Sequence, residues 1–136
     1  MSLTHEFPDA GSDRPLHGVS IHFRSTPEAL PRFSRALRAV LAEARIDRPV
    51  AARAAAAALA GVVDAVEHGS PEGIRNHVDV ELVVHEREIV LSIQDQRQPV
   101  TAAKADQSCT DLSLADSIAF LQRPEGRTLR LSFAHP

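Results

Sequence analysis

Apolar and polar residues alternate along four short stretches of the chain, a period of two that is typical of half-buried β-strands. The predicted strands span residues 16–23, 77–84, 89–93 and 127–133. Only a few polar residues separate the second stretch from the third, which predicts a tight β-hairpin. Strands with one apolar face need a second layer of structure to cover that face.

Two longer stretches repeat their apolar residues every three to four positions, as amphipathic helices do. The first opens at the start signals Ser25 and Pro27, with Glu28 placed for a capping box and Pro31 expected to delay the regular helix. Its predicted buried stripe comprises Phe33, Leu37, Val40, Leu41 and Ala44. The second helix is Ala-rich and is predicted to cover residues 47–68.

A third, shorter helix is predicted over residues 110–121, from a cap signal at Thr110 or Asp111 and the spacing of the apolar residues that follow. The resulting order is β-α-α-β-β-α-β. This order predicts an α+β two-layer sandwich, in which a mixed, mostly antiparallel sheet is covered on one face by about three helices. Residues 1–15 are polar and aperiodic and are expected to form a flexible arm, and residues 16–136 a single domain.

Length and charge narrow the class of protein. The chain has 136 residues and a net charge of −3, with 15 basic and 18 acidic residues, so no basic surface predicts a nucleic-acid partner. No apolar stretch predicts a membrane span, and the N-terminus is not signal-like. The single Cys109 cannot form an internal disulfide bond, so a reducing cytoplasm is the expected location.

The end of the second helix carries the first candidate chemistry. Ala60, Asp64 and His68 recur every four residues and therefore share one face of the helix. A carboxylate such as Asp64 could bind Mg²⁺ and leave space for phosphate oxygens, although an Asp and a His at a helix end are commonly only solvated. Glu67 points elsewhere and is expected to be exposed.

Asp95 is the second candidate, at the end of the third predicted strand in "SIQDQRQ". A carboxylate at a strand end can accept a hydrogen bond from the amino group of a base or orient a water molecule. Taken alone, such an aspartate is more often a turn residue.

Together these features resemble the serine kinase and anti-sigma factor family of the histidine-kinase-like (GHKL, Bergerat-fold) ATPases. The stretches "VVDAVEHG", "IQD" and "EGRTLRLSF" are similar to that family's patterns E-x-x-x-N-A-x-x-H-G, I-x-D-x-G-x-G and G-T-x-[VIL]-x-[LF]. The order of the predicted elements over residues 17–134 agrees with this resemblance. It implies the histidine-kinase-like fold, in which ATP and Mg²⁺ are the cofactors of the active members of the family.

Carried over position by position, the resemblance implies a damaged nucleotide site. Asp64 takes the place of the Mg²⁺-binding Asn, His68 matches the end of the first box, and Asp95 matches the aspartate that reads the adenine amino group. Ala60 replaces the Glu that acts as general base, and a methyl group cannot accept a proton. No catalytic residue is therefore expected.

The phosphate side of the implied site lacks its glycines. Arg97 and Pro99 stand where the family has Gly, and "QSCTDLSLADS" contains none. Gly126 and Thr128 fit the closing motif, where Thr supports the adenine-binding aspartate. The implied cofactor-binding residues are thus Asp64, His68, Asp95 and Thr128, with Asp64 as the metal ligand.

Three functions follow from the resemblance. The first is a regulator of the anti-sigma type that binds a sigma factor, a STAS-type antagonist or both, as a monomer or a homodimer, with nucleotide binding weak or lost. The second is an active ATP-dependent serine kinase that phosphorylates a STAS-domain partner. The third is a non-catalytic adaptor in two-component signalling, for which the phosphoacceptor helical hairpin is missing.

Other chemistries have weaker support in the sequence. The seven His show no zinc-like spacing, no G-x-S-x-G elbow surrounds Ser113 or Ser117, and Cys109 has no basic neighbour. Arg32, Arg35 and Arg38 recur on one side of the first helix. They predict either a solvated face or a surface for a partner.

Overall fold

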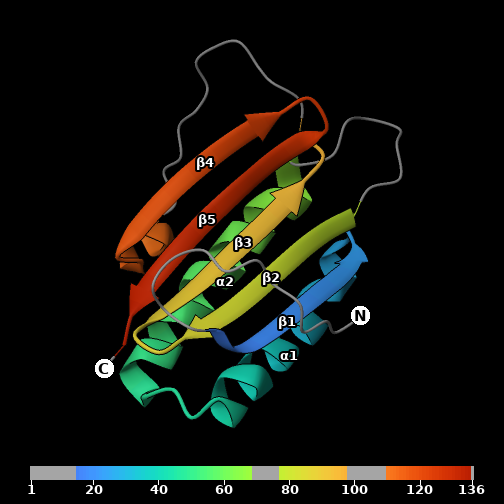
Figure 1. Ribbon diagram of the computed structural model, residues 1–136. Coiled ribbons are helices and arrows are strands. Elements are labelled where there is room, and N and C mark those ends of the chain that lie inside the picture. The colour runs from blue at the N-terminus through green and yellow to red at the C-terminus, as the bar shows by residue number, and fades with distance from the viewer. Residues whose placement is uncertain (1–14, 69–76, 98–109, 136) are drawn as a thin grey trace.

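An antiparallel sheet with two helices on one face forms the part of the chain that the computed structural model describes, residues 15–68, 77–97 and 110–135 (Figure 1). This architecture confirms the predicted α+β two-layer sandwich. The elements are β1 (Pro15–Arg24), the 3₁₀ turn η1 (Pro27–Ala29), α1 (Leu30–Glu43), α2 (Arg48–His68), β2 (His77–His85), β3 (Glu88–Asp95), the 3₁₀ turn η2 (Thr110–Leu114), β4 (Ser117–Arg123) and β5 (Gly126–Ala134).

The five strands lie in the order β1-β2-β3-β5-β4, and each neighbouring pair is antiparallel. Two-residue turns connect β2 to β3 and β4 to β5. The pairing of β3 with β5 joins segments that are distant in sequence, and it places Asp95 directly opposite Arg127. This pairing sets up the candidate site described below.

Alternating side chains of the strands make the buried face of the sheet, as the period of two predicts. On β3, for example, every second residue from Ile89 to Asp95 is buried. The predicted stripe on α1 is confirmed in part: Phe33, Leu37 and Leu41 are buried, whereas Val40 and Ala44 are half-buried. The regular helix begins at Leu30, with Pro31 in its first turn, after the η1 turn.

Small residues let α2 approach the sheet closely. A Cβ atom at Gly61 would lie 2.7 Å from Cδ1 of Ile93 and 3.0 Å from Cδ2 of Leu129. Ala54, Ala57, Ala58 and Ala65 share this buried side of the helix. The close packing of α2 on the sheet therefore depends on small side chains in the helix rather than on large ones.

The predicted helix over residues 110–121 is wrong. Its cap signal opens only the short η2 turn, and the residues that follow form strand β4, which pairs with β5 along its whole length. Short apolar runs do not distinguish helix from strand, and here the tight turn at Pro124 and Glu125 favours a hairpin. The described helix layer thus has two α-helices, and the described sheet is purely antiparallel.

Several predictions lie outside the described residues, namely the N-terminal arm up to residue 14, Pro99 and the segment with Cys109. By length and composition alone, α2 is apolar enough to cross a membrane, contrary to the sequence-based expectation. A core helix of a soluble protein passes the same test, and α2 packs one side against the sheet. Cytoplasmic location stays a prediction.

Candidate functional site

A buried carboxylate is the centre of the candidate site. Asp95, the last residue of β3, is 3% exposed and is the only buried charged side chain among the described residues. Burial of an ionised carboxylate is costly unless positive charge and hydrogen bonds compensate it. The surroundings of Asp95 should therefore contain donors.

Arg97 supplies those donors from two residues further along the chain. Its backbone N–H donates to Oδ1 of Asp95 at 2.8 Å, and its Nη2 donates to Oδ2 at 2.9 Å. The same Nη2 also donates to Oδ2 of Asp64 at 2.9 Å. One guanidinium group thus bridges the end of β3 and the last third of α2.

A second arginine completes the cluster from β5. Nη2 of Arg127 donates to Oδ2 of Asp64 at 3.0 Å, and its guanidinium carbon lies 4.7 Å from the ring centre of Phe120 on β4. The two arginine side chains are 16% and 18% exposed, whereas that of Asp64 is 37% exposed. The cluster holds two carboxylates and two guanidinium groups, so its formal charges balance.

Burial shifts two pKa values in this cluster. Desolvation raises the pKa of Asp95 above its ordinary value of 3.8, although the hydrogen bonds and positive charge of Arg97 act in the opposite direction. The pKa of Arg127 is lowered, first by burial and then by the nearby charge of Arg97. Asp95 and the two arginines are thus largely removed from water, whereas Asp64 is more open to solvent.

Backbone geometry beside Asp95 fixes the arrangement. Gly126 has a φ of 153°, and a Cβ atom there would lie 2.0 Å from the carbonyl oxygen of Asp95. The Gln122 side chain donates from Nε2 to the carbonyl oxygen of Arg97 at 2.9 Å and to that of Gly126 at 3.2 Å. The β4–β5 hairpin therefore braces the backbone that carries Arg97.

The structure brings together two of the four residues expected to bind a cofactor. Asp64 and Asp95 meet through Arg97. His68 is at the end of α2 with its side chain 64% exposed and its Nε2 3.7 Å from Glu67. Thr128 pairs with Gln94 and so faces the open side of the sheet, away from Asp95.

Arg127, not Thr128, therefore lies beside Asp95 on the helix side of the sheet. The sequence indicates this position of Arg127, because the residue follows Gly126 directly and alternates in phase with the apolar Leu129 and Leu131. A shift of one residue along a strand moves a side chain to the opposite face. A charged residue on the same face of a strand as buried apolar residues is expected to pair with a group of opposite charge.

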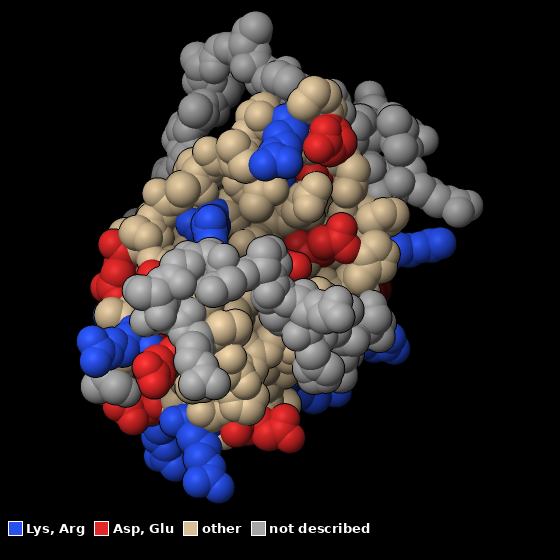
Figure 2. Space-filling view, in the orientation of Figure 1, with Lys and Arg blue, Asp and Glu red and all other residues tan. Residues whose placement is uncertain are grey.

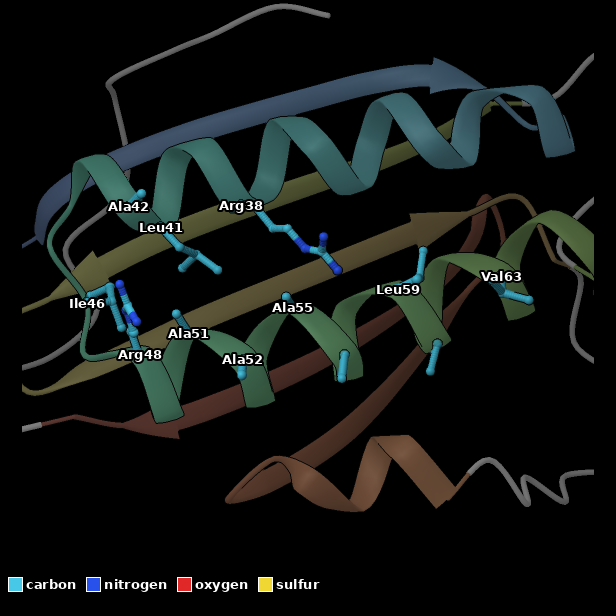
Figure 3. Close-up of a pocket in the computed structure, with 12 residues that line it drawn as sticks. Arg38, Leu41, Ala42, Ile46, Arg48, Ala51, Ala52, Ala55, Leu59 and Val63 are labelled. Atoms are coloured by element: carbon cyan, nitrogen blue, oxygen red, sulfur yellow. The ribbon is translucent and has the colours of Figure 1, made fainter.

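Ala60 lies one turn before Asp64, and its methyl group lines a separate hollow on the outer side of the helices. This groove between α1 and α2 has a volume of about 710 Å³ (Figure 3). Arg38 from α1 and Arg48 from the start of α2 extend into it. Its remaining lining is aliphatic and includes Leu41, Ala52, Ala55, Ala56, Leu59 and Val63.

Comparison with known proteins places the fold. No protein-family model matches the sequence, and no curated protein matches it. Among solved structures, the chain is similar to the crystal structure of the RsbU and RsbW domains of Rv1364c from Mycobacterium tuberculosis, with a TM-score of 0.66 and 21% identity. The match covers 88% of this chain but 33% of that one, and at this identity it shows the shared fold alone.

Replacing Arg97 tests whether the cluster stabilises the fold. We expect Arg97→Ala to lower the free energy of unfolding by about 2–4 kcal/mol, because it leaves the buried carboxylate of Asp95 without its nearest compensating charge. Urea denaturation followed by circular dichroism measures the change. Arg130→Ala, at an exposed position on β5, is the matched control and should lower the free energy of unfolding by under about 0.5 kcal/mol. Equal effects of the two variants would show that the cluster does not stabilise the fold.

The pH dependence of stability tests the environment of Asp95. Because its folded-state pKa lies above 3.8, the folded state keeps a proton that the unfolded state has already lost, so stability falls as pH rises through that window. Asp95→Asn removes this pH-dependent loss of stability, because an amide does not titrate, and its oxygen can still accept a hydrogen bond from Arg97. Urea midpoints measured from about pH 4 to pH 7 should therefore shift in favour of the variant as pH rises. A shift in favour of the wild type would mean that pairing with Arg97 outweighs burial.

Proposed function

We propose that this chain is a regulator of the anti-sigma type, which binds a sigma factor, a STAS-type antagonist or both, with nucleotide binding weak or lost and no kinase activity. The shared fold supports this proposal, since RsbW is an anti-sigma factor with a histidine-kinase-like domain. The sequence motifs resemble the same family. Regulation would then depend on the concentrations and affinities of partners rather than on phosphorylation.

The bridge from Arg97 to Asp64 and Asp95 is the observation that carries the proposal. The resemblance to the ATP-using members of that family implies that an aspartate in the position of Asp95 accepts a hydrogen bond from the adenine amino group. Here Nη2 of Arg97 donates to that carboxylate at 2.9 Å. The chain thus supplies from its own side chain the donor that a nucleotide would bring.

The surroundings of Asp64 also argue against an Mg²⁺–nucleotide complex. Its Oδ2 accepts from Arg97 and Arg127 at 2.9 and 3.0 Å, and a divalent cation there would face two positive charges. The position of the general base is held by Ala60, whose methyl group cannot take part in proton transfer. As arranged, these residues do not fit the metal.

The groove between α1 and α2 supports the binding part of the proposal. Its floor is aliphatic and about four helical turns long, from Arg48 to Val63. Arg38 and Arg48 add positive charge to it (Figure 3). These properties suit an amphipathic helix of a partner that carries acidic residues beside its apolar face.

One observation favours the kinase alternative, namely that Asp64 and Asp95 are both kept at one end of α2 and β3. An active enzyme would need Arg97 to leave this place when nucleotide binds. It would also need a general base from outside the motif.

Calorimetric titration with ATP and ADP in the presence of Mg²⁺ separates the two functions. We expect no saturable binding below about 1 mM, because Arg97 occupies the acceptor that adenine requires. Asp95→Asn is the control for any signal that is seen, since nucleotide binding at this site should depend on that carboxylate. Micromolar binding that Asp95→Asn abolishes, together with transfer of labelled phosphate to a STAS-domain protein, would establish the kinase instead.

Transcription in vitro tests the regulator. With purified polymerase and the sigma factors of the source organism, we expect the chain to inhibit at least one sigma factor without added nucleotide. Arg38→Glu in the groove should weaken that inhibition by about tenfold or more, because it places a negative charge against an acidic partner. Arg130→Glu, the same charge change on the open face of the sheet, should leave inhibition unchanged. Inhibition that needs ATP, or no inhibition of any sigma factor together with no binding of a STAS-domain protein, would contradict the proposal.

A further inference from the structure

Strand β4 is exposed on both faces of the sheet. All of its residues, Ser117–Arg123, are exposed, with Ile118, Phe120 and Leu121 at 42%, 47% and 48%. Ile118 and Phe120 point to the helix side, whereas Ala119 and Leu121 point to the open side. Such a concentration of exposed apolar side chains on one short element usually marks a contact surface.

The helix layer does not extend over β4. α2 packs against β3 and β5 in the centre of the sheet, and α1 lies at the side of β1 (Figure 1). In the orientation of Figure 2, the surface along β4 at the upper left is almost entirely uncharged. The outer backbone of β4 is therefore bordered by apolar side chains and not by charge.

Edge strands of soluble proteins are normally protected against further pairing by Lys, Pro, bulges or inward charges. β1, at the other edge, has such protection, with Pro15 at its start and irregular pairing between Pro15 and His17. Within the described residues β4 has none: residues 117–122 include no charge and no Pro, and their pairing with β5 is regular throughout. The two edges of the sheet thus differ in their protection against pairing with a further strand.

We propose that β4 pairs antiparallel with the β4 strand of a second copy of this chain, which joins the two sheets across a twofold axis at Phe120. Pairing about this central residue places Ala119 opposite the second copy's Leu121, and Ile118 opposite its Gln122. Arg123 falls opposite Ser117, so no like charges meet. This register repeats on both sides of the axis and contains no like-charge pair, as a twofold interface requires.

The proposed contact includes a residue of the charged cluster. Phe120 would pair with the second copy's Phe120, and its ring already lies 4.7 Å from the guanidinium carbon of Arg127. Arg127 in turn donates to Asp64. The inference depends on β4 alone and does not require the proposed function.

Sedimentation velocity of the full chain, from about 1 to 500 μM, measures the association. We expect reversible formation of a species with twice the monomer mass of 14.7 kDa. The double variant Ala119→Lys/Leu121→Lys should weaken it by about tenfold or more, because the introduced lysines lie opposite one another across the axis. Leu16→Lys on β1, another exposed leucine at a sheet edge, is the matched control and should leave it unchanged.

A charge exchange makes the test specific to the antiparallel register. The double variant Ala119→Glu/Leu121→Glu should also be monomeric, and mixing it with the double lysine variant should restore a dimer that contains one of each. Both side chains are exposed and on the open face, and unchanged thermal denaturation of each variant excludes unfolding as the cause. A wild type that stays monomeric at 500 μM, open-ended polymers, or a dimer that Leu16→Lys disrupts instead would overturn the proposal.

Discussion

The buried carboxylate at the end of β3 imposes the constraint on which the rest of the site depends. Asp95 cannot be left alone away from water, so a positive charge has to be close to it. The chain meets this requirement with Arg97 after the strand and with Arg127 opposite it in the sheet. The second carboxylate, Asp64, then gives both arginines a shared acceptor and ties the sheet to α2.

Small side chains on α2 account for a second group of features. On the side facing the sheet, Gly61 and the alanines allow contact at the limit of van der Waals distance. On the opposite side, further alanines leave a shallow aliphatic floor between the two helices. A helix that is apolar around most of its circumference serves two surfaces, which is also why its composition resembles that of a membrane-spanning helix.

Much of the fold could be predicted because it follows from local periodicity. The strands at 16–23, 77–84, 89–93 and 127–133 and both long helices agree with the structure within a few residues, since alternation and amphipathic spacing directly report which face is buried. The stretch containing Ile118 and Leu121 could not be assigned this way. Its spacing fits a helix, and only pairing with β5 decides that it is a strand.

The site was predictable in its acidic residues but not in their partners. Asp64 and Asp95 could be selected by position, whereas their convergence on Arg97 depends on side-chain geometry that no spacing encodes. The resemblance to the closing motif of the family implied that Thr128 supports Asp95. The register with Gln94 puts it on the other face of the sheet, which alternation along β5 alone could have indicated.

The bridge made by Arg97 also limits which single substitutions the fold tolerates. A single substitution that removes the Arg97 side chain leaves the carboxylates of Asp64 and Asp95 close to one another without the charge that both share, so its first effect is a loss of stability. A variant that binds a ligand in that space would need a second change at the same time, at one of the carboxylates or at Arg127. Arg97 therefore cannot be lost in one step without a penalty to folding.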